Sequence, residues 1–342
     1  MTMDALLEVR DLKIAFDSPR GVIRAVRGVS FSLCAGETLA VVGESGCGKS
    51  VLCKSLLGLL PHRGRVAGGS ILYAGRDLAA MGERELEGIR GKEIALVLQN
   101  PMSALNPSLP VGSQIARAAR AHGGISRAGA KARALELMAL TGISEPARRY
   151  GDYPHQFSGG MLQRCVLASA LACGPKLLVA DEPTTALDAT VQAQMLDLLR
   201  DIQHQTGTAI LFITHDLGAA ARIAGRVAVM YAGKLVEIGA AEEIYHDPRH
   251  PYTWGLLASV PSPEGTGELF SIPGAPPDLL HPPAGDAFAP RNPWALGVDW
   301  REEPPLFRVS DTHYAATWLL HPDAPRVDPP AGIGERRVSA GG

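Results

Sequence analysis

The sequence predicts an α/β fold built on a mostly parallel sheet. Three apolar runs, at residues 94–98, 177–180 and 209–213, each stop at polar residues. Continuous apolar runs are typical of parallel strands that are covered on both faces. A fourth run, Leu39–Val42, leads through a glycine-rich loop into a segment that can form a helix. Strands that alternate with helices in this way are typical of the α/β class.

The glycine-rich loop reads Gly43-Glu44-Ser45-Gly46-Cys47-Gly48-Lys49-Ser50. Its glycines let successive backbone N–H groups point inward and form a nest for anionic oxygens. The helix that follows adds the positive end of its dipole. Lys49 can reach the β- and γ-phosphates, and the Ser50 hydroxyl can ligate Mg²⁺. The loop therefore predicts nucleoside triphosphate binding, and we expect no chemistry from Cys47, which occupies a variable position.

Polar side chains stand where the other apolar runs end. Asp181 and Glu182 follow one run, and with a phosphate loop upstream Asp181 is a natural indirect ligand of Mg²⁺. Glu182 is the natural base for a water that attacks the γ-phosphate. Gln99 is a metal or water ligand, or else a solvated turn residue. His215 follows the last run, and we expect it to contact the γ-phosphate.

Ser158 is placed to cap a helix that runs from Gly160 to about Ala172. Each of the glycines Gly159 and Gly160 costs about 1 kcal/mol of helix propensity relative to alanine. Their place in the first turn indicates that the bare backbone is used, because open amides there can bind an incoming group.

The remaining elements complete the predicted architecture. An Ala- and Arg-rich stretch from Val111 to about Tyr153 has helical spacing and predicts a helical insertion. Residues 6–16 and 22–33 predict a β-hairpin before the loop, and residues 227–231 and 234–238 a closing hairpin. Phe16 ends the first of these strands and is either a core aromatic residue or a ligand contact.

Composition narrows the class of protein. The 342 residues are 46% hydrophobic and 20% charged, as in an ordinary globular chain, and 33 basic against 35 acidic residues speak against a nucleic-acid surface. No apolar run approaches the roughly 18–20 residues that cross a bilayer, and the first residues do not form a signal peptide. We therefore expect a cytoplasmic chain that meets membranes only through partners. Five cysteines predict small core residues rather than disulfides; they are Cys34, Cys47, Cys53, Cys165 and Cys173.

In this order the motifs resemble the ATP-binding cassette (ABC) ATPases. The resemblance rests on the phosphate loop, Gln99, Ser158-Gly159-Gly160, Asp181-Glu182, Ala186-Leu187-Asp188 and His215. Other phosphate-loop proteins lack the Ser-Gly-Gly signature before the acidic strand. The resemblance implies a phosphate-loop NTPase fold: a RecA-like sheet with an antiparallel β subdomain and a helical insertion at about 101–173.

The resemblance also implies a mechanism. Two cassettes face each other head to tail, with ATP between one phosphate loop and the other signature. Phe16 would stack on adenine, Lys49 and His215 would hold the γ-phosphate, Gln99 would attend Mg²⁺, and Asp188 would cross the interface. The implied nucleotide contacts are Phe16, Gly43, Glu44, Ser45, Gly46, Cys47, Gly48, Lys49, Ser50, Val51, Ser158, Gly159, Gly160 and Asp188.

A narrower resemblance, to the peptide and nickel permease ATPases, rests on residues 99–107, 157–164, 250–253, 285–293 and 302–306. It implies an ATPase subunit of a bacterial importer, peripheral at the cytoplasmic face of the inner membrane. The implied partners are a second ABC ATPase, two transmembrane permease subunits and, indirectly, an extracytoplasmic solute-binding protein. Peptides are the expected cargo, with nickel or metal chelates and glutathione-like compounds as alternatives. A soluble ABC ATPase acting on ribosomes or DNA would carry a second cassette or a long coiled-coil insertion, and this chain has neither.

The resemblance divides the chain into a cassette, residues 1–260, and a C-terminal extension, residues 261–342. Many family members carry four cysteines in this extension, thought to hold an iron–sulfur cluster. Their positions correspond to Asp286, Asn292, Asp299 and Thr317, so the thiolates are absent and we predict no cluster. The extension holds 15 of the 26 prolines and is expected to be loop-rich, packed against the cassette by Trp294, Trp300, Phe307 and Trp318.

Overall fold

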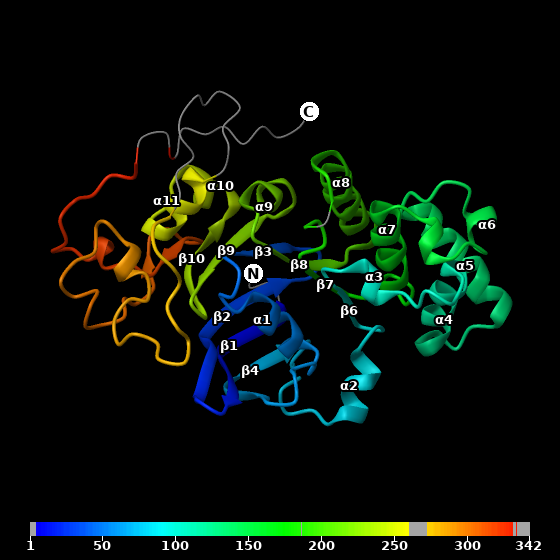
Figure 1. The fold of residues 1–342 in the computed structure, drawn as a ribbon, viewed down its shortest axis with the longest axis horizontal. Helices are drawn as coiled ribbons and strands as arrows, with labels where there is room; N and C mark the ends of the chain where they lie inside the picture. Colours follow the sequence, from blue (N-terminus) through cyan, green and yellow to red (C-terminus); the bar gives the residue numbers. More distant parts are fainter. Residues whose placement is uncertain (1–4, 186, 260–271, 331–332, 334–342) are drawn as a thin grey trace. The chain divides into compact units, whose positions relative to one another are not determined.

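The computed structural model describes residues 5–185, 187–259, 272–330 and 333 (Figure 1). They form two compact units. The first comprises Leu33–Thr38 and Ala80–Ile213 and is called the helical unit below. The second comprises Leu6–Ser32, Leu39–Ala79 and the residues from Thr214 onward, and is called the phosphate-loop unit. The predicted boundary between residues 260 and 261 lies outside the described residues, as does Ala186.

The three strands of the helical unit are parallel, as their apolar runs predicted. Strand β7 pairs with β6 on one side and with β8 on the other. Leu178 lies opposite Ala95 and Ile210, so the three runs are in register. The strands are β6 (Ile94–Val97), β7 (Leu177–Asp181) and β8 (Ala209–Thr214). Every residue of β7 and β8 is buried, which explains why these segments are continuously apolar.

The predicted helical insertion is confirmed as a group of packed helices. Helices α4, α5 and α7 contact one another, and α5 buries Ala130, Ala134, Leu137 and Met138 on one face. A short helix directly after Gln99 was not predicted; it begins at Pro101 with the Asn100 side chain as its cap. The helices of this unit are α2 (Glu83–Ile89), α3 (Pro101–Ala104), α4 (Val111–Gly123), α5 (Arg127–Leu140), α6 (Pro146–Arg149), α7 (Gly159–Ala170) and α8 (Ala189–Thr206).

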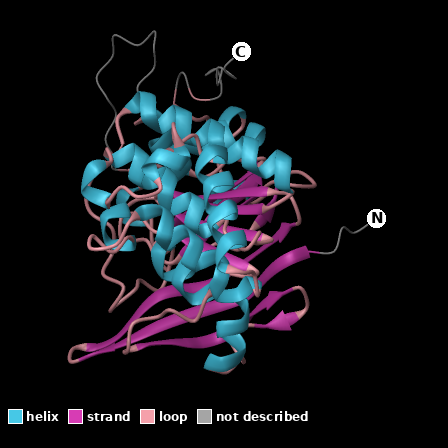
Figure 2. Ribbon diagram, turned by 90° about the vertical axis from the view of Figure 1, so that its right-hand side faces the viewer, coloured by secondary structure: helices cyan, strands magenta, loops and turns pink. Residues whose placement is uncertain are grey.

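The phosphate-loop unit begins with an antiparallel sheet of strand order β2-β1-β4-β5. Figure 2 shows its long strands in magenta. The strands are β1 (Ala5–Ser18), β2 (Gly21–Cys34), β4 (Gly64–Tyr73) and β5 (Arg76–Asp77). Strand β1 continues two residues past Phe16, so the predicted five-residue turn shrinks to Pro19-Arg20.

A second group of hydrogen-bonded strands in this unit carries the phosphate loop. Strand β3 (Thr38–Val42) pairs parallel with β9 (Arg226–Tyr231), and β9 returns through the turn Ala232-Gly233 to β10 (Lys234–Ala240). This is the predicted closing hairpin. The extension then adds β12 (Tyr314–Ala315) to β10, and β11 (Phe307–Arg308) to β12. The helices of the unit are α1 (Lys49–Leu56), α9 (Leu217–Ile223), α10 (Ala241–His246) and α11 (Pro251–Ala258).

The extension is loop-rich, as predicted, but its aromatic anchors differ from the expected set. Trp294 packs edge-on against Trp254 of α11, with ring centroids 5.2 Å apart. The expectation for Trp300 was wrong, because 58% of it is exposed. Phe307 and Trp318 pack on each other. The residue that reaches the centre of the unit is Phe288, whose ring contacts Tyr231 and Tyr252.

The cysteines follow the prediction of core positions only in part. Cys47, Cys53 and Cys165 are buried, whereas Cys34 and Cys173 are only partly so. The core prediction for cysteine therefore holds for three of the five. Within the described residues, no helix is both long and apolar enough to span a bilayer.

Candidate nucleotide site

Lys49 is enclosed by the loop that it ends. Its ammonium group donates to the backbone oxygens of Gly43, at 2.7 Å, and Glu44, at 2.9 Å, and only 4% of the residue is exposed. The side chain therefore lies across the loop, with its charge inside the curve. Burial raises the pKa of the neighbouring Cys47 thiol, so this cysteine is a neutral packing group, as expected.

Two glycines of the loop are required by close backbone approaches. Gly43 has φ 156°, and a Cβ there would lie 2.1 Å from the backbone oxygen of Met230. Gly48 has φ 109°, and its Cβ would lie 2.5 Å from the backbone oxygen of Ala25. Strands β2 and β9 thus press against the loop at these two points. A side chain at either position would push the loop off its strands.

Phe16 and His215 belong to the same unit as the loop. Phe16 is half-buried and pairs with Gly64 on β4; a Cβ on Gly64 would come within 2.6 Å of the Phe16 ring. The glycine therefore leaves room for the ring in its present position. His215 is exposed at the end of β8, one residue before Asp216, whose carboxylate caps α9. Its position at a strand terminus is as the sequence predicted.

In the helical unit, Glu182 is held in an unusual conformation. It has φ 49°, in the left-handed region that costs a non-glycine residue roughly 1–3 kcal/mol. Its backbone N–H donates to Ile213 at 2.9 Å. Its carboxylate accepts from the Gln99 amide at 2.9 Å and from the Thr185 hydroxyl at 3.0 Å. The structure therefore brings together Glu182 and Gln99, as predicted, and adds Thr185, which the sequence reasoning missed.

The Ser-Gly-Gly segment starts α7 as predicted. The Ser158 hydroxyl accepts from the N–H of Met161, so Ser158 is the N-cap. Gly160 is explained by packing, since a Cβ there would lie 2.7 Å from a methyl group of Val191. A Cβ on Gly159 would meet nothing within 4 Å, and Gly159 is exposed. Packing against the described residues therefore does not account for this glycine.

Asp188 caps a helix. Its carboxylate accepts from the N–H of Val191 at 2.9 Å and so begins α8. The residue is exposed, so its other carboxylate face is accessible. Apart from the position of Asp188 before a long helix, nothing in the sequence indicates this capping role.

Each unit carries oxygen donors of the kind that suits Mg²⁺, the ion that the phosphate loop implies. The candidates are the hydroxyl of Ser50, the carboxylate of Asp181 and the amide oxygen of Gln99, all hard oxygen donors. Asp181 ends β7 and is 5% exposed. These groups match the preference of Mg²⁺ for a few protein oxygens beside water and phosphate.

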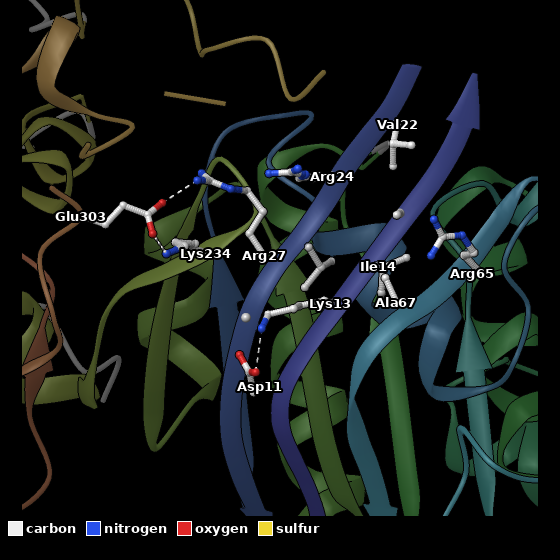
Figure 3. Close-up of a pocket in the computed structure, with 13 residues that line it drawn as sticks. Asp11, Lys13, Ile14, Val22, Arg24, Arg27, Arg65, Ala67, Lys234 and Glu303 are labelled. Atoms are coloured by element: carbon white, nitrogen blue, oxygen red, sulfur yellow. Dashed lines mark hydrogen bonds and ion pairs between the residues drawn. The ribbon is translucent and has the colours of Figure 1, made fainter. Parts of the chain in front are cut away.

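A separate cavity of about 670 Å³ opens on the antiparallel sheet (Figure 3). It is lined by residues of β1, β2 and β4, together with Lys234 and Glu303. Glu303 points at Arg27 and Lys234 and accepts hydrogen bonds from both. None of the residues from Gly43 to Ser50 lines this cavity, so it is not the phosphate site.

Comparison with known proteins decides the family. The family model described as "ABC transporter" matches residues 26–185, and that described as "Oligopeptide/dipeptide transporter, C-terminal region" matches residues 236–297. The oligopeptide transport ATP-binding protein OppD of Bacillus subtilis is 56% identical over 96% of this chain and 92% of its own length. The dipeptide transport ATP-binding protein DppD of Lactococcus lactis is 52% identical over 96% and 95%. The chain belongs to the oligopeptide/dipeptide ABC transporter ATP-binding proteins.

Solved ABC cassettes share the fold of this oligopeptide/dipeptide family member. A dimeric cassette in a post-hydrolysis state, bound to ADP and phosphate, has a TM-score of 0.62 and 25% identity over 69% of this chain and 98% of its own. A component of the cbiONQ complex from Clostridium perfringens has a TM-score of 0.63 and 25% identity over 71% and 92%. The chain is therefore an ABC ATPase with a phosphate-loop cassette fold, as its motifs predicted.

The four extension positions considered for a cluster carry buried oxygen side chains in this family member. Each accepts a backbone N–H: Asp286 from Phe288, Asn292 from Trp294, Asp299 from Leu296 and Thr317 from Leu319. All four residues are at most 8% exposed. They do not fit an iron–sulfur cluster, because they offer no thiolate and their oxygens already serve the local turns. In the described part of the chain, no group of three His, Cys, Asp or Glu residues is arranged to hold a metal.

Asp286 gives the extension a pH-dependent stability. Burial raises its pKa from 3.8 to about 6, against the lowering effect of the Phe288 N–H, and the Asp299 carboxylate adds to the rise. Because the folded pKa lies above the unfolded one, the contribution is fully present below pH 3.8 and is lost as pH rises through 6.

Asp286→Asn keeps the acceptor but removes the buried charge. We expect it to raise the free energy of unfolding by up to about 1.5 kcal/mol at pH 5 and about 3 kcal/mol at pH 8. Urea unfolding of the full-length chain at both pH values measures this, with the exposed Asp311→Asn as the control. If the free energies of unfolding of Asp286→Asn and the parent protein differed by the same amount at both pH values, the raised pKa of Asp286 would be contradicted.

Proposed function

We propose that this chain is the energy-coupling ATPase of a bacterial importer for dipeptides and oligopeptides. The observation that carries the proposal is the similarity to peptide transport ATP-binding proteins along almost the whole chain, C-terminal region included. A soluble ABC ATPase acting on ribosomes or DNA has no such support. The chain acts as a peripheral subunit at the cytoplasmic face of the membrane.

The proposed assembly contains a second ABC ATPase, either a second copy or a relative, and two transmembrane permease subunits. An extracytoplasmic solute-binding protein delivers the cargo to the permease. The two ATPases meet head to tail, so that the Ser158–Gly160 segment of one faces the phosphate loop of the other. The exposed Gly159, which no contact with the described residues explains, supports this arrangement. ATP then links the two subunits, and its hydrolysis releases them.

Each site residue receives a proposed role. The amides of residues 43–51 bind the phosphates, Lys49 and His215 hold the γ-phosphate, and Phe16 stacks on adenine. Ser50, Asp181 and Gln99 attend Mg²⁺, which when bound neutralises charge on the phosphates. Glu182 accepts a proton from the attacking water, and the γ-phosphate is transferred to that water. Asp188 reaches the partner ATPase with the carboxylate oxygen that does not cap α8.

Gln99 is also the proposed link to the permease. It bonds the Glu182 carboxylate, and the following residues 101–104 form the short helix α3. Met102 in this helix is 61% exposed. A permease contact on α3 would thus act on the residue that orients the catalytic carboxylate.

The proposal is tested by purifying the ATPase together with its permease subunits in lipid nanodiscs and adding its solute-binding protein. We expect hydrolysis to rise several-fold when that protein is loaded with a short peptide. Stimulation by nickel chelates or glutathione but not by peptides would contradict the peptide assignment. Failure to co-purify with any permease subunit would contradict the transport role.

A further inference from the structure

The C-terminal extension contacts the phosphate loop at Arg291. Its guanidinium donates to both carboxylate oxygens of Glu44, with Nη1 to Oε2 at 2.7 Å and Nη2 to Oε1 at 2.9 Å. The Arg291 side chain is 5% exposed and that of Glu44 26%. Glu44 is the second residue of the phosphate loop, 247 positions away in the sequence. A two-point, largely buried pair of this kind is among the stronger contacts that side chains make.

Besides Glu44, the Arg291 guanidinium contacts residues of the extension and of β9. Its Nε donates to the Pro273 oxygen at 2.7 Å, and Nη1 also donates to the Tyr231 hydroxyl at 3.3 Å. It lies over the rings of Tyr231 and Phe288. The short 3₁₀ turn Ala289–Arg291, which follows the Asp286 turn, sets its backbone. Burial opposes the charge, but the hydrogen bonds to Glu44 and Tyr231 raise the pKa of Arg291, so it stays protonated.

The backbone of Glu44 is tied to the nucleotide-binding lysine. Its N–H donates to the Tyr252 hydroxyl at 2.8 Å, and its oxygen accepts from Lys49 at 2.9 Å. The same residue therefore joins α11, the extension and Lys49. A change at the Glu44 side chain is transmitted directly to the carbonyl that holds the Lys49 ammonium.

The pair also neutralises the negative charge of Glu44. A carboxylate in a loop that binds a triphosphate repels its ligand unless it is neutralised. Arg291 supplies the neutralising charge from the side of the extension, while the loop backbone is left to the phosphates. Among the described residues, no cation other than Arg291 forms an ion pair with the partly buried Glu44 carboxylate, so loss of Arg291 would leave this charge uncompensated there.

We propose that Arg291 is a positioning residue for ATP binding, acting through Glu44, so that docking of the C-terminal extension completes the phosphate loop. The inference concerns nucleotide binding and does not depend on the cargo of the transporter. If Arg291 had a purely structural role, it would be one of several residues that hold the extension against the cassette. Another such contact exists: Glu303 of the extension bonds Arg27 of β2 and Lys234 of β10, and none of these three residues belongs to the loop (Figure 3).

The test is a double-mutant cycle on the full-length chain, with Kd measured by titration of a fluorescent ATP analogue with Mg²⁺. Arg291→Met is expected to weaken binding about tenfold or more, because it leaves the Glu44 charge uncompensated. Glu44→Gln removes the negative charge and keeps one acceptor for Arg291, so we expect it to weaken binding less than Arg291→Met does. The double variant should return to the value of Glu44→Gln, because no unpaired carboxylate is left.

Glu303→Gln is the matched control, and its Kd should be unchanged even where its melting temperature falls. The proposal is overturned if Arg291→Met binds like the parent, if Glu303→Gln weakens binding as much, or if the double variant stays as weak as Arg291→Met. Should Arg291→Met not fold, Arg291→Lys carries the test. Lysine keeps the charge but not the two-point geometry, so we expect binding about threefold weaker, and an unchanged Kd overturns the proposal.

Discussion

Replacing Glu182 with glutamine is expected to lower kcat for ATP hydrolysis by about 10²- to 10⁴-fold, the usual contribution of a general base. ATP binding should be preserved, because the change is isosteric. The glutamine oxygen can still accept from Gln99 and Thr185, which now hold the carboxylate at 2.9 and 3.0 Å. The left-handed backbone at this position is likewise held by the N–H bond to Ile213. Only the ability to take a proton from water is lost.

Steady-state hydrolysis and nucleotide titration on the same preparation measure the two effects separately. Glu136→Gln is a suitable control, because Glu136 makes an exposed ion pair with Arg133 on α5 of the same unit. Its hydrolysis rate should equal that of the parent protein. If Glu182→Gln also hydrolysed ATP at the parental rate, Glu182 would not be the base.

Replacing Lys49 with alanine is expected to act on binding itself. The ammonium group lies inside the loop and holds the oxygens of Gly43 and Glu44. Its removal eliminates a charged donor for the phosphates and the two hydrogen bonds that hold the loop together from inside. Each charge-assisted hydrogen bond contributes about 1.5–3 kcal/mol, so we expect Kd for ATP to rise about 10- to 100-fold or more.

Lys54→Ala provides the control for this variant. Lys54 lies in the last turn of the same helix, α1, and is half-exposed. A lysine-to-alanine change there tests whether loss of positive charge near the loop is enough to weaken binding. We expect an unchanged Kd for Lys54→Ala. Unchanged binding by Lys49→Ala would show that the loop does not need its lysine.

The elements that the sequence predicted well are those whose signals are local. Leu177–Asp181 is continuously apolar because both faces of β7 are buried. Gly43 and Gly48 are glycines because neighbouring backbone oxygens leave no room for a Cβ. Ser158 caps α7 through a hydroxyl three residues from its partner amide. In each case the signal in the sequence is local, although the backbone oxygens that require Gly43 and Gly48 belong to Met230 and Ala25, which are distant in the sequence.

The features that could not be predicted depend on contacts between distant segments or on backbone geometry. Arg291 and Phe288 lie in a proline-rich stretch without periodicity, yet they pack against Glu44 and Tyr231. Trp300 is one of the four expected anchors, but it is exposed. The φ of Glu182 and its bond to Thr185 leave no trace in residue types.

The central claim is that ATP is bound between unlike surfaces of two ATPase subunits. The most direct measurement is a structure of the Glu182→Gln protein, assembled with its permease and partner ATPase, in ATP and Mg²⁺. We expect the phosphates to lie on residues 43–50 of one subunit and to contact the Ser158–Gly160 segment of the other. ATP fully enclosed by one subunit, with Gly159 facing solvent, would contradict it.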